Sequence, residues 1–510
     1  MVHQRADRYY PYGSHMFFWT GDANTGVFNG SVNGYFAEYE HAAELRGFPT
    51  PVEKLTVSAN RYRQNRYLPQ TSTEMTVSKR DYSALSPLLL AGINSPQVEA
   101  FKRRNRDVQL TMDAALQTNL QRSLAIDDSV RIKRVSVVVM EDNTGDVLAS
   151  AMYPLPPVDN WDMLTLSESE LNSFPGWNVN ADPGFTRATQ PGSTAKLVTA
   201  LAAFNKLGDR AASMRIMVYP QDLIRIKGPE PDEAGNISIE RGIVRSNNSF
   251  FIRLANQERL EEEMGTVYLQ TGMFLHGVGG YYYSRGEVDA TREERWRDLW
   301  RDTEFKSIRS YNPNNIKRTR GKGISGMSWG QGELIATPAA VARVASGIAN
   351  NGLLMPNRYV ISVSGKTIAP GKGVPLVAKP GYANKMKDYM LQQSAGKTTR
   401  LGIKVAGKTG TPERIWKGER INDGWYVFFT PKAKGAGHIV TCIRLEAAKG
   451  SSEAVRLAGQ YVIPVLQQRG YIKSFPMDTV VRRTPQVVTG RNSKPAVEVQ
   501  VEEPIDTVPQ

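Results

Sequence analysis

Two groups of strand-forming residues, far apart in the sequence, constrain the fold of this chain most. Val135–Met140 is a β-branched run, and Val147–Met152 is a second apolar stretch. Asn143-Thr144-Gly145 lies between them, and a turn of this composition between two such runs predicts a β-hairpin. Three more strand candidates, joined by Gly- and Pro-containing turns, follow much later at Lys404–Thr409, Trp425–Phe429 and His438–Leu445.

The residues around and between these groups have helical patterns. Asp113 can cap a helix to Leu124, and Pro191-Gly192 precedes an apolar helix over Ser193–Leu207. Thr337-Pro338 is typical of a helix start, with a stop at Asn350-Asn351-Gly352, and Ser452–Gln468 predicts a closing helix. Together the elements predict an α+β fold, with one antiparallel sheet assembled from both ends of a domain and helices on its faces.

The length of 510 residues allows one large domain and smaller parts. Residues 1–105 are polar, rich in Tyr, Asn and Gly, and predict an irregular small domain. Residues 106–474 hold the predicted sheet and helices. Residues 475–510 are mostly Pro, Val, Thr and mixed charge, which predicts a disordered tail.

Charge and cysteine content exclude several functions. The net charge of +14 would suit an acidic partner, but the basic clusters Lys102–Arg106 and Lys317–Arg320 lack the interleaved aromatic residues of a nucleic-acid groove. No nucleic-acid partner is therefore expected. The single cysteine, Cys442, lies in an apolar run and is expected to be a small buried hydrophobic residue. No run approaches the roughly 18 apolar residues of a membrane-spanning helix, and the first residues have no signal-peptide pattern.

Several common catalytic patterns are missing from the sequence. The five histidines form no metal-spaced pair, and there is no HExxH or CxxC, so neither a metal nor a histidine-dependent serine triad is expected. A GxGxxG occurs at residues 321–326, but it follows a basic segment instead of an apolar strand. It therefore predicts a flexible loop and no nucleotide site.

The first candidate motif is Ser193-Thr194-Ala195-Lys196. Residues three apart share a helix face, so the amine of Lys196 can reach the hydroxyl of Ser193. Burial and a second cation would each lower the pKa of Lys196 and make it a base for a serine nucleophile. A capping serine followed by a solvated lysine is the plainer alternative.

Two further motifs follow, and each is common on its own. Ser246-Asn247-Asn248 is an SxN, otherwise typical of a turn or helix cap. Lys408-Thr409-Gly410-Thr411 ends a strand candidate, where the glycine admits a ligand backbone and the side chains of Lys408, Thr409 and Thr411 offer donors for a carboxylate.

In this order, SxxK, SxN and KTG form the motif set of the penicillin-recognising serine enzymes. The stretch from about Gln109 to Gly470 resembles the transpeptidase domain of class B penicillin-binding proteins. Leu110–Asp113 resembles its opening, Asn143–Ala151 its hairpin, and Trp329–Gly332 with Thr337-Pro338 its GQG segment. Arg8–Gly13 and Leu45-Arg46-Gly47 resemble the pedestal that precedes this domain. Residues 1–105 would then be a partial pedestal, starting after the membrane anchor that family members carry.

The resemblance implies a role for each motif residue. Ser193 would be the acylated nucleophile and Lys196 its general base, kept neutral partly by Lys408. Ser246 would relay a proton to the leaving group, and Asn248 would hold the substrate amide and Lys196. The substrate carboxylate would be bound by Lys408, Thr409 and Thr411, and Gly410 would also belong to the substrate-binding set.

The resemblance also implies a β-lactamase/transpeptidase-like fold with a five-stranded sheet, and a peptidoglycan D,D-transpeptidase that uses no cofactor. Its partners would be D-alanyl-D-alanine stem peptides, β-lactams and a membrane glycan polymerase, outside the bacterial inner membrane. A D,D-carboxypeptidase or β-lactamase passing the acyl group to water stays an alternative, as does a non-catalytic scaffold of wall synthesis. A β-lactam sensor would need a membrane signalling segment.

Overall fold

The structure is a computed structural model that describes residues 4–5, 8–21, 34–49, 52–57, 73–78, 82–131, 133–156, 182–223, 232–275, 323–416 and 419–473. Contacts within the chain divide it into residues 1–474 and 475–510. The expected tail lies outside the described residues, as do the basic cluster Lys317–Arg320 and the first two residues of the GxGxxG. The domain boundaries at 105 and 474 stay predictions.

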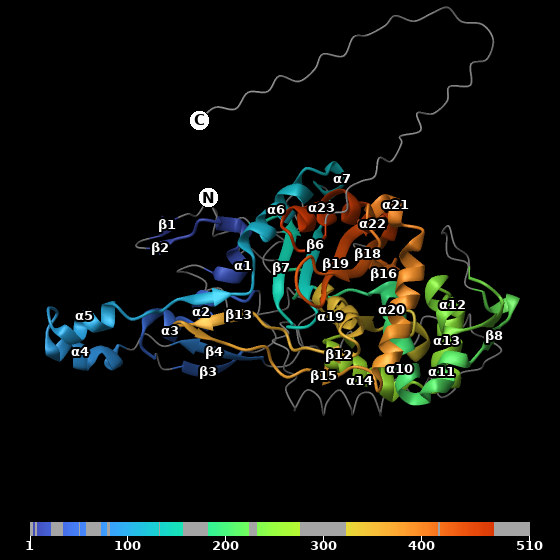
Figure 1. Cartoon of the computed structure of the whole chain (residues 1–510), viewed down its shortest axis with the longest axis horizontal. Coiled ribbons are helices and arrows are strands. Elements are labelled where there is room, and N and C mark those ends of the chain that lie inside the picture. The colour runs from blue at the N-terminus through green and yellow to red at the C-terminus, as the bar shows by residue number, and fades with distance from the viewer. Residues whose placement is uncertain are drawn as a thin grey trace, which may run out of the picture. The chain divides into compact units, whose positions relative to one another are not determined.

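An antiparallel sheet lies at the centre of the first unit (Figure 1). Its five-strand path runs in the order β16-β18-β19-β6-β7, and the sixth strand, β17, pairs with β18. The early hairpin thus lies beside the late strands, which confirms the predicted α+β fold with an antiparallel sheet. The sheet has one strand more than the five expected, because β17 joins it through β18. The strands are β6 (Val135–Glu141), β7 (Val147–Tyr153), β16 (Ala406–Gly410), β17 (Glu413–Trp416), β18 (Glu419–Pro431) and β19 (His438–Ala448).

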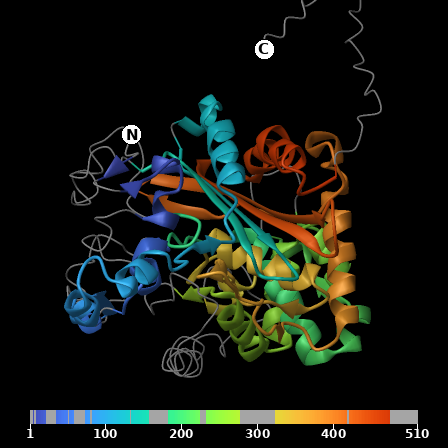
Figure 2. The same cartoon turned by 60° about the vertical axis from the view of Figure 1, so that its left-hand side comes forward.

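Helices cover both faces of this sheet, as Figure 2 shows from a second side. Successive strand residues face opposite ways, so Val137 and Val139 join one apolar core while Val138 and Met140 join the other. The first core includes helices α6 (Ala114–Ala125), α22 (Ser451–Leu457) and α23 (Ile463–Gln468). The second includes α10 (Lys196–Leu207), α13 (Asn248–Gln257), α14 (Glu261–Thr271), α19 (Pro338–Ala349) and α20 (Pro380–Ala395).

The predicted helix ends are largely confirmed. The Asp113 carboxylate accepts hydrogen bonds from the backbone N–H groups of Ala115 and Leu116 at the start of α6. The Thr337 hydroxyl accepts one from Ala340 at the start of α19. The closing helix differs, because a π-helical turn, Ala458–Val462, separates α22 from α23. The flexible loop expected at the GxGxxG is wrong for its described part, since helix α18 begins at Gly323 and ends at Met327.

Cys442 is fully buried on β19, as expected, and burial raises the pKa of its thiol. Among the described helices, none has the length and apolar character needed to span a bilayer.

The N-terminal region contains short elements that partly share the core of the larger domain. Trp19, in the first α-helix (Phe17–Thr20), is buried. The centre of its ring lies 5.4 Å from that of Phe185 and 5.8 Å from that of Tyr359. The region consists of β1 (Gln4–Arg5), β2 (Arg8–Tyr9), α1 (Phe17–Thr20), α2 (Ala37–Glu40), α3 (Ala42–Arg46), β3 (Val52–Val57), β4 (Thr73–Ser78), α4 (Ser86–Ala91) and α5 (Pro96–Lys102). Strand β5 (Val108–Leu110) then pairs with β13 (Val360–Val363) at the entry to the larger domain.

Candidate active site

Ser193 lies in a tight 3-10 turn, Gly192–Ala195, that leads into α10. The sequence predicted a helix from Ser193, whereas the regular α-helix begins at Lys196. Gly192 explains the turn: its φ is +56°, and a Cβ atom there would lie 2.8 Å from Cδ of Pro412 and 3.0 Å from the backbone N of Thr411. Only glycine lets the Ser193 turn approach the end of the KTG strand this closely.

The GQG segment supports the same turn from another side. The Gly192 N–H donates to the carbonyl of Gly330 at 2.9 Å, and a Cβ on Gly330 would lie 1.9 Å from the Gly192 oxygen. The Gln331 amide, oriented so that both bonds form, donates to the Glu413 carbonyl at 3.3 Å and accepts from its N–H at 3.1 Å. This segment therefore joins the Ser193 turn to β17.

Ser246 is the point at which the three motifs meet. It precedes α13 with a φ of +55°, a left-handed conformation that is uncommon for a residue with a side chain. Its hydroxyl accepts a hydrogen bond from Nζ of Lys196 at 3.1 Å and one from Nζ of Lys408 at 2.9 Å. One side chain from each motif thus converges on a single oxygen atom.

Lys196 is fully buried, and burial lowers its pKa from 10.5 to about 7. The carboxylate of Asp232 acts in the opposite direction and raises it. Burial is the main cause of this lowering, and the contribution expected from Lys408 stays a prediction. Nζ of Lys196 also donates to Oδ1 of Asn248 at 2.6 Å and to the carbonyl of Ser246.

Ser193 is half-buried. Within the part of the chain that the structure describes, no hydrogen bond joins the Ser193 hydroxyl to Lys196, whose amine donates to Ser246 and Asn248. The predicted proton transfer between the two side chains stays a prediction. Catalytic contacts of this kind are often long before substrate binds and shorten afterwards.

Asp232 is a residue that sequence reasoning missed. Its carboxylate accepts hydrogen bonds from the backbone N–H groups of Asn248 at 2.9 Å and Ser249 at 3.0 Å, and from the Ser249 hydroxyl at 2.7 Å. A negative charge at the N-terminus of α13 stabilises that end of the helix. The sequence offers no signal for this role, because Asp232 belongs to no motif and meets α13 only in the folded chain.

The KTG residues lie on β16, the edge strand of the five-strand path. Oγ1 of Thr409 lies 3.2 Å from the amide group of Gln393. A Cβ on Gly410 would lie 2.6 Å from the carbonyl of Pro191, so this glycine also lies against the Ser193 segment. Oγ1 of Thr411 accepts from the Ser451 N–H at 3.0 Å and keeps its own proton for donation.

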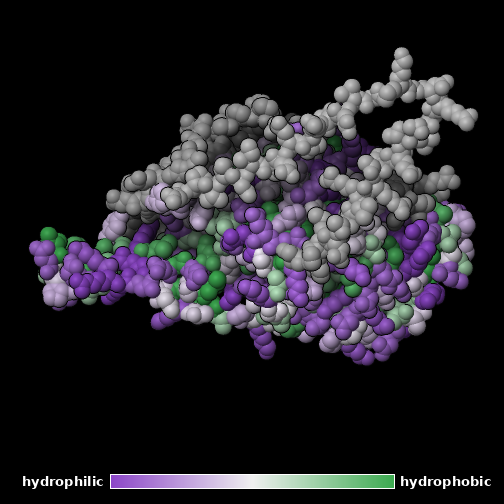
Figure 3. Space-filling view, turned by 45° about the horizontal axis from the view of Figure 1, so that its top comes forward, coloured by the Kyte–Doolittle hydropathy of each residue, from purple (hydrophilic) through white to green (hydrophobic). Residues whose placement is uncertain are grey.

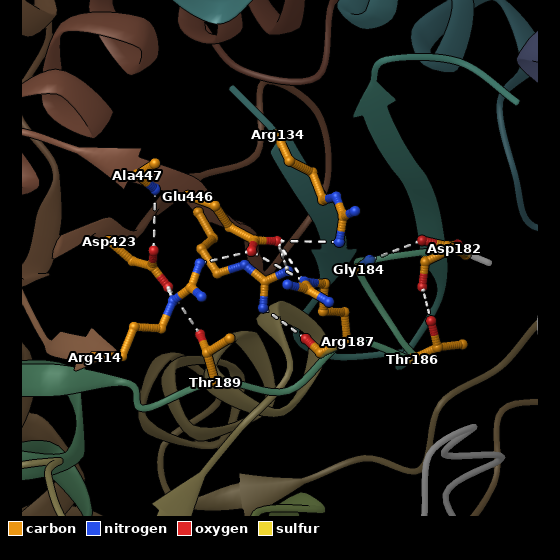
Figure 4. Close-up of polar contacts among 11 residues, drawn as sticks. Arg134, Asp182, Gly184, Thr186, Arg187, Thr189, Arg414, Asp423, Glu446 and Ala447 are labelled. Carbon is orange, nitrogen blue, oxygen red and sulfur yellow. Dashed lines mark hydrogen bonds and ion pairs between the residues drawn. The ribbon is translucent and has the colours of Figure 1, made fainter. Parts of the chain in front are cut away.

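A buried cluster of arginines and acids surrounds Glu446 and Asp423 (Figure 4). The fully buried carboxylate of Glu446 pairs with four guanidinium groups, those of Arg134, Arg187, Arg414 and Arg444. Asp423 accepts from Arg414 at 2.9 Å and from the hydroxyl of Thr189 at 3.2 Å. The Asp423 N–H donates to the Pro412 carbonyl at 3.2 Å. The cluster therefore joins the segment before Ser193 to the segment after the KTG motif.

The described residues contain no group of three or more His, Cys, Asp or Glu side chains arranged to hold a metal ion.

The family model of the penicillin-binding protein transpeptidase domain matches residues 135–461. The chain belongs to this family. A curated relative, the peptidoglycan D,D-transpeptidase MrdA of Haemophilus influenzae, is 25% identical over 397 residues. That match covers 71% of this chain and 57% of the relative, so the chain spans little more than half of the relative's length. Together these matches confirm the resemblance to class B penicillin-binding proteins.

Solved structures share the fold at low sequence identity. The transpeptidase domain of Burkholderia pseudomallei penicillin-binding protein 3 superposes with a TM-score of 0.50 at 17% identity, over 72% of this chain and 98% of that one. Penicillin-binding protein A of M. tuberculosis, solved as a ceftriaxone acyl-enzyme complex, gives a TM-score of 0.51 at 18% identity, over 83% and 91%. A peptidoglycan synthetase of Bifidobacterium adolescentis gives 0.53 at 16% identity, over 89% and 74%.

Proposed function

We propose that this chain is a peptidoglycan D,D-transpeptidase in which Ser193 attacks the peptide bond of a D-alanyl-D-alanine end. The observation that carries the proposal is the position of the Ser246 hydroxyl between Lys196 and Lys408. It supports the assignment because residues of three separate motifs make one site. Membership of the transpeptidase family supports the reaction class.

Lys196 would act as the general base. With a pKa of about 7, a large fraction of its amine is uncharged near neutral pH and can accept the Ser193 proton. The hydrogen bond to Asn248 would hold the Lys196 amine in position for this step. As the Ser193 oxygen bonds to the carbonyl carbon, its proton passes to Lys196. Ser246, in contact with both lysines, would then relay a proton to the departing amine of D-alanine.

The end of β16 would recognise the substrate. An edge strand offers its unpaired backbone groups to an extended peptide, and Gly410 lets the end of this strand lie against the Ser193 segment. Lys408, Thr409 and Thr411 would bind the terminal carboxylate by charge and hydrogen bonds. Asn248 would hold the substrate amide in addition to Lys196.

The oxyanion of the tetrahedral intermediate would be stabilised by the backbone N–H groups of Ser193 and Thr411. The close approach of Gly192 to the N atom of Thr411 supports this pairing. The start of α10, just after Ser193, adds the positive end of a helix dipole. Donors of this kind are each worth roughly 3 to 4 kcal/mol in the transition state.

An amine of a neighbouring stem peptide would next attack the acyl-enzyme and release Ser193 with a new cross-link. A β-lactam would acylate the same serine, as ceftriaxone does in the M. tuberculosis relative. No cofactor takes part in these steps. The substrate is a wall polymer, so the site would work outside the bacterial inner membrane, beside a membrane glycan polymerase that supplies the strands.

Mass spectrometry of the intact protein after exposure to penicillin tests the proposal. The mass should rise by one penicillin molecule, and Ser193→Ala should prevent the increase. Ser213→Ala is the matched control, because Ser213 is an exposed serine on another helix. Labelling of the Ser193→Ala variant at the parent rate would refute the assignment.

The lifetime of the adduct separates the alternatives. A transpeptidase should keep the penicillin for hours and join a donor peptide to an added amine. Rapid release of hydrolysed penicillin would favour a β-lactamase, and cleavage of D-alanine without transfer to the amine would favour a D,D-carboxypeptidase. A chain that never forms an adduct would be a scaffold.

A further inference from the structure

The helical hairpin of α4 and α5 presents apolar side chains that the described part of the chain leaves exposed. Neither helix has a buried residue. Leu89 is 66% exposed, Leu90 is 89% exposed and Ile93, in the turn between the helices, is 73% exposed. Three large aliphatic side chains so close together in water indicate a contact surface, because isolated exposed residues are ordinary but clusters are not.

Basic residues lie at the other end of α5. The segment 82–106 contains four basic residues and one acid, Glu99, which pairs with Lys102 at 3.0 Å. Arg103 and Arg104 follow α5 directly and are exposed. The hairpin therefore has an apolar tip and a cationic base, and Figure 3 shows hydrophobic and hydrophilic surface side by side in this region, at its left edge.

The distance between the apolar tip and the cationic base of the hairpin is comparable to the thickness of the headgroup layer of a bilayer. The seven residues of α5 span roughly 10 Å at the α-helical rise per residue. The headgroup layer on each side of a bilayer is roughly 5 to 8 Å thick. If the tip enters the acyl chains, the guanidinium groups of Arg103 and Arg104 stand at the level of the lipid phosphates.

We propose that the α4–α5 hairpin docks on a lipid bilayer with anionic headgroups, inserting Leu89, Leu90 and Ile93 while Arg103 and Arg104 contact the phosphates. The charge of the base favours this occupant over a neutral protein surface, because basic residues beside an apolar face are typical of interfacial helices. A surface contact of this kind would fix the distance of the larger domain from the membrane. It goes beyond the proposed catalytic function and does not depend on it.

Flotation of the purified full chain with vesicles tests the proposal. The chain should bind vesicles of phosphatidylglycerol and phosphatidylethanolamine, and bind phosphatidylcholine vesicles much less. The paired variant Leu90→Ser with Ile93→Ser should lower the partition coefficient by at least roughly tenfold, from the loss of apolar burial. Arg103→Glu should lower binding to the anionic vesicles by roughly fivefold or more.

Ile126→Ser is the matched control, because Ile126 is equally exposed, at 70%, but lies at the end of α6. This variant should bind as the parent does. Penicillin labelling of Ser193 should be equal in all variants, which separates a failure of docking from a failure of the catalytic proposal.

A second measurement covers the case of a variant that does not fold. Ile93→Trp adds a fluorophore at the tip to the eight tryptophans of the chain, and the difference between its emission and that of the parent should shift to shorter wavelength when anionic vesicles are added. An unchanged spectrum, or equal binding by parent and Leu90→Ser, would overturn the proposal. The parent chain could instead form a concentration-dependent dimer that Leu90→Ser dissociates, without binding vesicles. That result would show that a second copy of the chain covers the hairpin, and it would also overturn the membrane proposal.

Discussion

Replacing Glu446 by glutamine tests whether the buried arginine cluster holds the active site together. The carboxylate is fully buried and lies 2.8 Å from Arg187, 2.9 Å from Arg414 and 3.1 Å from Arg444. Glu446→Gln keeps the shape of the side chain but leaves four guanidinium groups beside one acid, Asp423. Removing one partner from a buried ion pair costs roughly 3 to 5 kcal/mol, because the remaining charge stays buried without compensation.

The magnitude can be followed by thermal unfolding. For the roughly 350 residues that the structure describes, an unfolding entropy of about 2.1 cal/mol/K per residue converts this loss into a fall in Tm of roughly 4 to 7 °C. Glu258→Gln is the control, since Glu258 pairs at 2.9 Å with the exposed Arg210 and should change stability by at most about 1 kcal/mol. Penicillin labelling of the Glu446 variant should also slow, because the cluster joins the segments on either side of the site.

The pH dependence gives the prediction a sign. Burial by itself raises the pKa of Glu446, but the surrounding arginines, Arg187 foremost, outweigh it and hold the pKa far below its usual range. The stabilisation is therefore complete above the ordinary carboxyl pKa and is lost as the pH falls below it. The stability difference between parent and Glu446→Gln should shrink in acid. A difference below 1 kcal/mol at pH 7, or one that grows in acid, would refute the reasoning.

Three further predictions concern the site itself. The rate of acylation by penicillin should rise with pH through a midpoint near 7, as Lys196 loses its proton. Asp232→Asn should move this midpoint to lower pH, because Asp232 raises the pKa of Lys196. An unmoved midpoint in a stopped-flow pH profile would contradict the assignment. Lys408→Met should raise the KM for a peptide carboxylate more than it lowers kcat, which steady-state kinetics can separate. Gly192→Ala should destabilise the chain by about 1 to 3 kcal/mol and reduce labelling, whereas Gly381→Ala, where a Cβ meets nothing within 4 Å, should do neither in the same denaturation and labelling assays.

Much of the fold was predictable because its signals are local. The hairpin of β6 and β7 follows from β-branched runs around an Asn-Thr-Gly turn, and α6 begins at Asp113 because a carboxylate caps free N–H groups wherever it occurs. Strand β17 was not predicted, since Glu413–Trp416 is short, mixed in character and defined only by its pairing with β18. The loop expected at Gly323 was wrong for a related reason, because packing can hold a glycine-containing segment in a helix against its weak propensity.

The candidate site divides in the same way. The residue types and their order along the chain are properties of the sequence, and they were sufficient to indicate a serine, a base and a carboxylate-binding strand. Three features of the site exist only in the folded chain. Lys196 and Lys408 both donate to the hydroxyl of Ser246, the pKa of Lys196 is lowered, and Asp232 accepts hydrogen bonds at the start of α13. A pKa depends on burial and neighbouring charge, and both are set by residues distant in sequence. The sequence supplied the reactive groups. Tertiary packing set the distances between them and their exposure to water, and therefore their protonation.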